Sequence, residues 1–409
     1  MNDLIVFFPL CQNDDIEECF KLYDEIIRND NLENASYFVS LLIKLAEKYN
    51  LYDNLFNSLL THLLINNENS FTLALERKKE ISENLKKVVI NDFKIIFKMF
   101  NTDFSSLTSL QQDLITNFIP SKPIINQELF DISSSLQKGL SDCKNVDEFY
   151  NTLEKFFLNY GVGKFGLNKA FRYENNQICP IIHIGNGRLN QLIGYESQKQ
   201  KLTQNTEAFL SGKKANNVLL YGDSGTGKSS SIKALLNEYY KEGLRMVEIY
   251  KHQFKYLPSI TQELQSRNYK FILFMDDLSF EEFEIEYKYL KAVIEGGLEK
   301  KPDNILIYAT SNRRHLVKQT WSDRQGQDEV NINDAKQEKT SLSSRFGVKI
   351  LYTHPDRQNY LDIVDGLAKQ YNLHMSQEEL HQKALAWEIR YGGFSGRTAK
   401  QFINAMLGR

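Results

Sequence analysis

A glycine-rich stretch, "VLLYGDSGTGKSS", carries residue types that bind phosphate. Gly222, Gly227, Lys228 and Ser229 match the pattern GxxxxGK[ST] without a mismatch. Glycines let the backbone curl so that successive N–H groups point at phosphate oxygens, and the helix that follows adds its dipole. We expect Lys228 to reach the β- and γ-phosphates and Ser229 to bind Mg²⁺. The residues expected to hold the nucleotide are Gly222, Asp223, Ser224, Gly225, Thr226, Gly227, Lys228, Ser229 and Ser230.

Two adjacent carboxylates follow an apolar run about 50 residues later, in "FILFMDDLSF". In proteins with such a phosphate loop, a neighbouring strand ends in an aspartate that holds Mg²⁺, and Asp276 fits that place. Asp277 would then face the attacking water as a base or as an orienting group. Without the phosphate loop, the same pair would be interpreted as two solvated loop acids.

Three further polar residues occur in a consistent order after these motifs. Asn312 ends the apolar run "NILIYATSN", Arg345 precedes a strand in "SLSSRFGVKI", and Arg397 opens a helix in "GGFSGRTAKQF". Taken singly, an Asn at a strand end is turn chemistry, and each Arg is a surface or ion-pair residue. Their order after a phosphate loop favours groups that contact the γ-phosphate and the water.

The elements that must position these residues are short apolar runs alternating with helical patterns. Runs such as "NVLLY", "FILFM" and "VKILY" are typical of a parallel sheet covered by helices. The sequence thus predicts an α/β nucleotide-binding domain over 190–353. A small helical lid is expected over 354–409, an all-helical domain over 1–160, and a linker with a short strand over 161–189. The polar stretch from Val317 to Leu342 is expected to be a loop.

Bulk properties narrow the class of protein. The 409 residues are 42% hydrophobic and 25% charged, which suffices for two or three domains, and no stretch is apolar enough to span a membrane. The four cysteines show no metal-binding spacing, so a reducing cytoplasm is expected. Residues 1–150 hold 23 acidic and 14 basic side chains, whereas residues 151–409 hold 29 and 36. The basic part suits an anionic ligand such as a nucleotide.

The order of the motifs resembles that of the AAA+ ATPases. "LIGYESQK" (Leu192 to Lys199) resembles box II, "GDSGTGKSS" Walker A, "FILFMDD" Walker B, "ATSN" sensor 1, "SRFG" box VII and "SGR" sensor 2. From about Asn190 to Arg409 the amino-acid sequence resembles that of one bacterial family of predicted ATPases, domain of unknown function 815. The likeness extends more weakly over the helical N-terminal region.

The resemblance implies a cofactor, ATP with Mg²⁺, and a role for each motif. Ile193 and Gly194 would line the adenine pocket, and Asn312 would be sensor 1. Arg345 would act in the site of a neighbouring subunit, which implies a homo-oligomer, and Arg397 would report the γ-phosphate from the lid. Most AAA+ proteins have Asp–Glu in Walker B, whereas this chain has Asp277. Its carboxylate would stand back by about 1.5 Å, the length of one C–C bond, which could slow hydrolysis.

Two functions remain in competition at this stage. The first is an ATPase that hydrolyses ATP with Mg²⁺ and remodels an unidentified macromolecule. The second is a nucleotide-gated binding module or switch, such as a helicase loader or an initiator-like DNA binder, with slow or no turnover. A protein or nucleic-acid partner is expected in either case, with the acidic helical region as the candidate for choosing it. No membrane partner is expected.

Overall fold

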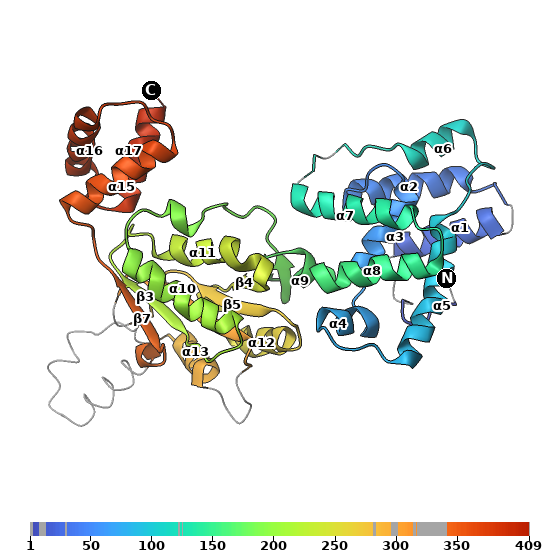
Figure 1. Cartoon of the computed structure of the whole chain (residues 1–409), viewed down its shortest axis with the longest axis horizontal. Helices are drawn as coiled ribbons and strands as arrows, with labels where there is room; N and C mark the ends of the chain where they lie inside the picture. The colour runs from blue at the N-terminus through green and yellow to red at the C-terminus, as the bar shows by residue number, and fades with distance from the viewer. Residues whose placement is uncertain are drawn as a thin grey trace. The chain divides into compact units, whose positions relative to one another are not determined.

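The structure is a computed structural model in which the chain divides into two compact units, Met1–Asn168 and Lys169–Arg409 (Figure 1). It describes residues 3–7, 14–28, 31–121, 123–124, 126–280, 284–295, 302–313, 316 and 342–408. Within these ranges no helix is long and apolar enough to cross a membrane. The polar stretch that begins at Val317 lies outside the described residues as far as residue 341.

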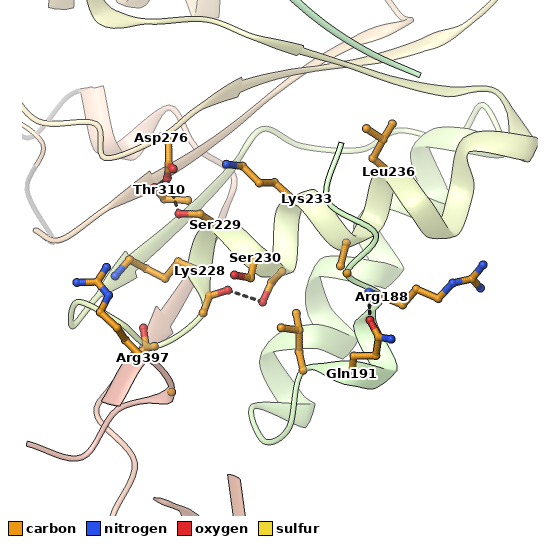
Figure 2. A pocket seen from close by; sticks show the side chains of 18 of the residues that line it. Arg188, Gln191, Lys228, Ser229, Ser230, Lys233, Leu236, Asp276, Thr310 and Arg397 are labelled. Carbon is orange, nitrogen blue, oxygen red and sulfur yellow. Dashed lines mark hydrogen bonds between the residues drawn. The ribbon is translucent and has the colours of Figure 1, made fainter. Parts of the chain in front are cut away.

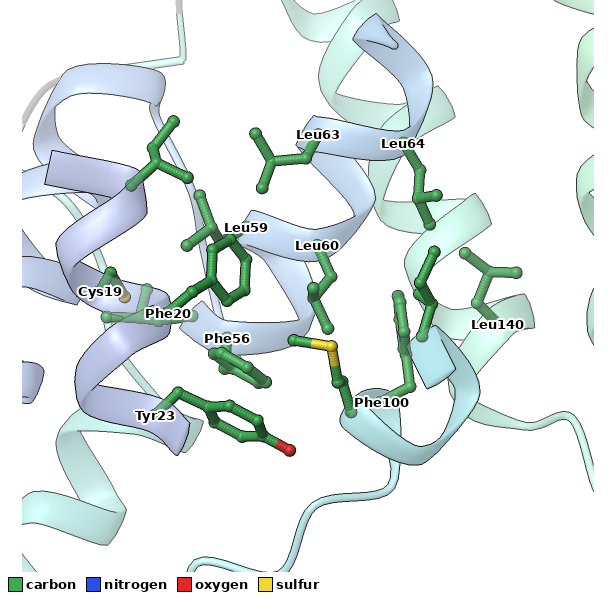
Figure 3. Close-up of a cluster of buried hydrophobic side chains, with 14 of the residues drawn as sticks. Cys19, Phe20, Tyr23, Phe56, Leu59, Leu60, Leu63, Leu64, Phe100 and Leu140 are labelled. Atoms are coloured by element: carbon green, nitrogen blue, oxygen red, sulfur yellow. The ribbon is translucent and has the colours of Figure 1, made fainter. Parts of the chain in front are cut away.

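The first unit is helical, as the spacing of its apolar residues predicts. Its α-helices are α1 (Asp14–Tyr23), α2 (Ala35–Tyr49), α3 (Leu55–Asn66), α4 (Ser70–Glu76), α5 (Glu83–Phe100), α6 (Ser109–Thr116), α7 (Gln127–Ser141), α8 (Val146–Tyr160) and α9 (Gly163–Leu167). Asn and Ser side chains cap several helix starts. The side chains of Asn54 and Asn145, for example, accept backbone N–H groups of α3 and α8. Aromatic rings fill the core between these helices: Tyr23 stacks on Phe56 at 4.8 Å (Figure 3).

A buried carboxylate anchors the start of the chain in this unit. Asp92 in α5 is 0% exposed and accepts hydrogen bonds from three consecutive backbone N–H groups, those of Ile5, Val6 and Phe7, at 2.7 to 3.2 Å. Phe7 then packs on Phe93 with ring centroids 5.3 Å apart. The short N-terminal segment is therefore part of the core of the first unit.

The second unit is built on a seven-stranded sheet with the order β2-β1-β4-β5-β6-β3-β7. The strands are β1 (Ala170–Glu174), β2 (Gln177–Pro180), β3 (Val218–Gly222), β4 (Leu244–Glu248), β5 (Lys270–Met275), β6 (Ile305–Ser311) and β7 (Val348–Tyr352). β1 and β2 form an antiparallel hairpin, and all other pairs are parallel. Because β3 lies between β6 and β7, with Tyr221 opposite Ser311, the carboxyl ends of these strands meet at one edge.

Helices cover the sheet on both faces. α10 (Glu196–Leu210) and α11 (Lys228–Tyr239) bury Leu202, Ile232 and Leu235 against one face of the sheet. α12 (Leu257–Gln265) connects β4 to β5, and α13 (Glu286–Glu295) lies between β5 and β6. From β4 to β5 and from β5 to β6 the chain moves across the sheet toward β3, whereas from β3 to β4 it moves away from β3 in the opposite direction. Right-handed crossovers in opposite directions place their helices on opposite faces.

Three helices after β7 form a small lid with its own core. They are α15 (Arg357–Gln370), α16 (Gln377–Tyr391) and α17 (Gly396–Leu407). Tyr360, Val364, Phe402 and Ile403 are buried between them. The expected architecture, an α/β P-loop core with a helical lid and a helical N-terminal region, is confirmed by the strand order and the order of the elements. The segment expected as a linker, 161–189, contains α9 and the β1–β2 hairpin, and the division between the units falls inside it.

Candidate nucleotide site

The phosphate loop joins β3 to α11 through three glycines with positive φ. These are Gly222 (125°), Gly225 (75°) and Gly227 (91°), the last of which caps α11. A Cβ atom on Gly222 would lie 2.0 Å from the carbonyl oxygen of Tyr352 on β7. Glycine is required there both by conformation and by this close approach. The loop is thereby held between β7 and the start of α11.

Lys228 is folded into the loop and is 6% exposed. Its ammonium donates to the carbonyl oxygens of Gly222 (2.9 Å) and Asp223 (2.6 Å), and to Oδ1 of Asn312 (3.0 Å). Burial lowers the pKa of Lys228 from its ordinary value, and the neighbouring carboxylates, Asp223 foremost, oppose this effect. The lysine expected to bind phosphate is thus already desolvated and aimed at the strand ends.

Ser229, Asp276 and Thr310 meet beside the loop. Oδ1 of Asp276 accepts a hydrogen bond from the hydroxyl of Ser229 at 2.5 Å and another from the hydroxyl of Thr310 at 2.6 Å. A serine hydroxyl and a carboxylate side by side are oxygen ligands of the kind Mg²⁺ prefers. The two residues expected to bind the metal are therefore brought together. Thr310 is a further partner, for which the sequence analysis predicted no role although it lies in the motif "ATSN".

The side chain of Asp277 contacts Asn312, whereas that of Asp276 contacts Ser229 and Thr310. Nδ2 of Asn312 donates to Oδ1 of Asp277 at 2.8 Å, while Oδ1 of Asn312 accepts from Lys228. The backbone of Asp277 has φ 51°, in the left-handed region where Asp and Asn are enriched among non-glycine residues. A lysine, an amide and a carboxylate thus form a continuous hydrogen-bonded row.

The segment before α10 supplies an apolar wall. Gly194 and Tyr195 both have positive φ, 80° and 60°, which is unusual for a residue as bulky as tyrosine. The conformation is held in place because the Tyr195 hydroxyl donates to the carbonyl of Thr353 and its ring stacks on Tyr352 at 5.0 Å. Ile193 packs against the core of the lid. This turn therefore links the sheet with the lid.

The lid contacts the phosphate loop directly. The backbone N–H of Arg397 donates to the carbonyl of Gly225 at 3.1 Å, and Nη1 of Arg397 lies 3.4 Å from the hydroxyl of Ser224. A Cβ on Gly225 would come within 3.1 Å of Cβ of Arg397 and of Oγ of Ser395. The start of α17 is thus fitted against the outside of the loop.

These groups line one cavity of about 1140 Å³ (Figure 2). The sequence-predicted residues that line it are Ile193, Gly194, Ser224, Gly225, Thr226, Gly227, Lys228, Ser229, Ser230, Asp276, Asp277, Asn312 and Arg397. Gly222, Asp223 and Arg345 are not among the residues that line it. Figure 2 shows Lys228, Ser229, Asp276 and Arg397 near the N-terminal end of α11, with Lys233 about one turn further along the same helix. Tyr195, Thr310 and Ile363 also line the cavity without having been singled out from the sequence.

A family model decides what this chain is related to. The model described as "Protein of unknown function (DUF815)" matches residues 167–409, which is more than half of the chain. The chain belongs to this family. The match begins just before β1, so the DUF815 region contains the hairpin, the sheet and the lid. Curated proteins give no match.

Solved structures give distant matches to the DUF815 chain. The RuvB Holliday junction branch migration motor of Thermotoga maritima is 14% identical over 54% of this chain and 72% of that chain, with a TM-score of 0.34. A single-residue mutant of the same motor has the same identity and coverage, with a TM-score of 0.35.

Arg345 lies apart from the cavity of its own DUF815 chain. It is exposed and precedes β7, whose opposite end, Tyr352, pairs with Gly222 at the phosphate loop. The length of β7 alone is about 13 Å, at about 3.3 Å per residue. Arg345 is therefore at the amino edge of the parallel sheet, whereas the cavity opens at the carboxyl edge.

The residues of the cavity fit a nucleotide with Mg²⁺. The loop has the glycine conformations that turn N–H groups inward, and Lys228 supplies a charge beside them. Ser229 and Asp276 supply oxygen ligands, while Ile193 and Ile363 supply an apolar wall suited to a base.

Proposed function

We propose that this chain binds ATP with Mg²⁺ and hydrolyses it within a homo-oligomer, so that changes at the nucleotide drive remodelling of a macromolecular partner. The observation that carries the proposal is the row Lys228–Asn312–Asp277, placed beside the pair Ser229–Asp276. A phosphate-binding group, a water-orienting group and a metal-binding pair occur there at hydrogen-bond distances. Chemistry of this kind depends mainly on such positioning.

Each residue has a role that follows from its contacts. Lys228 and the loop N–H groups bind phosphate oxygens, and Ser229 and Asp276 hold the metal. When bound, Mg²⁺ with ATP supplies the transferable phosphoryl group and offsets its negative charge. Asp277 orients the attacking water and takes its proton, with its carboxylate held by Asn312. Ile193 and Gly194 contact the base.

Two arginines complete the proposed mechanism from different subunits. Arg397 adjoins the loop through Gly225 and Ser224, so it can act within its own subunit and report the γ-phosphate to the lid. Arg345 lies at the other edge of the sheet and can contribute to hydrolysis only at the site of a neighbour. The proposal therefore requires assembly of several subunits. We propose separately that the protein acts in the cytoplasm. The acidic first unit is the candidate for binding a protein or nucleic-acid partner.

The second candidate is a nucleotide-gated switch with slow or no turnover. The conformation of Asp277 favours it, because its side chain is short and is held by Asn312. The excess of basic residues over 151–409 would let such a switch bind DNA. ATP-dependent, salt-sensitive DNA binding would support this candidate, and DNA binding that is absent or indifferent to ATP would count against it.

Phosphate release at high protein concentration tests the first candidate. The wild-type protein is expected to release phosphate at a rate that rises with concentration as subunits assemble. Lys228→Ala is the control that removes phosphate binding, and Arg345→Ala should abolish the concentration-dependent part. A wild-type rate equal to that of Lys228→Ala would refute hydrolysis. ATP binding without release would leave the switch as the function.

A further inference from the structure

Thr310 makes contacts with three consecutive residues at the end of β5. Its hydroxyl donates to Oδ1 of Asp276 at 2.6 Å and accepts from the backbone N–H of Asp277 at 2.9 Å. Its carbonyl oxygen accepts from the backbone N–H of Leu278 at 2.7 Å. Thr310 lies on β6, is 2% exposed, and is separated from the pair by more than 30 residues of sequence. The chain after β5 is therefore held by this one residue, through its hydroxyl group and its backbone carbonyl.

The direction of these hydrogen bonds is fixed by chemistry. The backbone N–H of Asp277 can only donate, so the oxygen of Thr310 accepts from it. The single proton of the Thr310 hydroxyl is donated to the carboxylate of Asp276, which accepts. Both donors to Asp276, Thr310 and Ser229, go to the same oxygen, Oδ1. In the described part of the chain, Oδ2 of Asp276 accepts no hydrogen bond. The carboxylate is thus held at one oxygen and left open at the other.

The contact with Asp277 controls a different property. Asp277 has φ 51°, a conformation that costs a non-glycine residue free energy unless its surroundings hold it. The bond from its N–H to Thr310 holds the backbone in that conformation, and the Asp277 carboxylate then reaches Asn312. One hydroxyl therefore orients both carboxylates of the site.

We propose that Thr310 is a positioning residue, which sets the orientation of Asp276 toward Mg²⁺ and of Asp277 toward the water through a single hydroxyl group. The inference rests on the proposed function and adds to it. Residues that orient metal ligands typically contribute 10- to 100-fold in metal affinity or activity when removed. The same range is expected for loss of the Thr310 hydroxyl.

Thr310→Val tests the proposal because it removes the hydroxyl and keeps the shape. The carbonyl bond to Leu278 is a backbone contact and survives the change, so the chain after β5 stays attached to β6. Thr310→Ser keeps the hydroxyl and is the rescue variant. Thr206→Val is the matched control: Thr206 in α10 is 0% exposed and bonds to the hydroxyl of Tyr308, away from the carboxylates.

The readout is the dissociation constant of a non-hydrolysable ATP analogue, measured by calorimetry with MgCl₂ and again with EDTA. In Thr310→Val, the gain in affinity from Mg²⁺ should fall by about 10-fold or more, while the affinity in EDTA stays near that of the wild type. Thr310→Ser and Thr206→Val should keep the wild-type gain. Phosphate release, measured in parallel, should show a lower kcat in Thr310→Val, with KM changing less.

Several results would overturn the proposal. One is a Thr310→Val protein whose nucleotide affinity gains as much from Mg²⁺ as that of the wild type. Another is a Thr310→Ser protein that loses as much of this gain as Thr310→Val does, because the hydroxyl would then not be the cause. If Thr310→Val fails to fold, Thr310→Cys replaces it, since a thiol is a weak donor. Thr310→Cys should then gain less nucleotide affinity from Mg²⁺ than Thr310→Ser does. Equal gains in these two variants would refute the proposal. Absence of nucleotide binding in the wild type would instead refute the proposed function.

Discussion

The carboxylate of Asp223 accepts a 2.7 Å hydrogen bond from the backbone N–H of His354. Asp223 belongs to the phosphate loop, and His354 lies between β7 and the lid. The ring of His354 in turn contacts the carbonyl of Phe394, just before α17, at 2.8 Å. One aspartate and one histidine thus connect the loop with the start of the lid and with the turn between α16 and α17. The sequence placed Asp223 among the phosphate-binding residues, whereas the structure directs its side chain to the lid.

Replacing Asp223 should therefore loosen the lid. Asp223→Ala removes the acceptor, and we expect binding of ADP to weaken by about fivefold, which corresponds to about 1 kcal/mol. Amide hydrogen exchange at the start of α15 should become faster. Asp223→Asn retains a carbonyl acceptor and should lie between Ala and the wild type. Unchanged exchange in Asp223→Ala would show that the hydrogen bond does not hold the lid.

Gly366 should control the shape of the base-binding wall. A Cβ at this position of α15 would lie 2.3 Å from Cδ1 of Ile193, so Gly366→Ala must displace Ile193. We expect weaker binding of ATP and unchanged binding of inorganic triphosphate, which has no base. Gly139→Ala is the control, because Gly139 in α7 has its nearest neighbour at 3.7 Å. Equal losses for both ligands would contradict this role of Ile193.

Lengthening the side chain of Asp277 by one methylene group should slow hydrolysis. Asp277→Glu places a less tolerated residue at φ 51° and moves the carboxylate away from Asn312. We expect kcat to fall by about 100-fold, the loss associated with a catalytic group displaced by about 1 Å. Asp277→Asn should fall further, because it removes the base. A faster Asp277→Glu enzyme would show that the short side chain limits the rate.

Asp92 should be essential to the stability of the first unit. Asp92→Ala leaves three backbone N–H groups without their acceptor, and the free energy of unfolding should drop by about 3 kcal/mol or more. Asp92→Asn keeps one acceptor oxygen and should cost less. Urea denaturation of the full chain measures the difference, with Asp113→Ala on the surface of α6 as the control. A loss no larger than the control's would contradict the anchoring role.

The first unit should lose stability in mild acid because of His62. Burial lowers the pKa of His62 to about 4, whereas the unfolded chain has the ordinary value of about 6.5. Between pH 6.5 and 4, His62 is therefore protonated in the unfolded chain and neutral in the folded one. The contribution is fully present above pH 6.5 and is lost as the pH falls from 6.5 toward 4. His62→Phe, which keeps a ring beside Tyr49, should flatten the pH dependence of the urea midpoint between pH 7 and 4.5.

Local signals predicted much of the second unit. β3 and the loop after it could be predicted because the glycine spacing, Lys228 and an apolar run occur together. Asp276 could be predicted because it directly follows the apolar run "FILFM" further along the chain. Thr310 lies within the motif "ATSN", but only Asn312 was given a role, because a threonine inside a strand carries no signal of its own. The position of Thr310 beside Asp276 continues the pairing of Met275 with Ala309. Tyr195 was missed because its positive φ depends on contacts with Tyr352 and Thr353. Such roles arise from contacts between distant residues.

The β1–β2 hairpin has a consequence for the solubility of fragments of this chain. Without it, the edge of the sheet would be β4, an almost fully buried strand with open N–H and C=O groups, which is a template for aggregation. With it, the edge is β2, which has four residues and ends in Pro180. A short strand closed by proline pairs poorly with another chain. A fragment that begins at residue 190 would lack this protection, whereas one that begins before β1 would keep it.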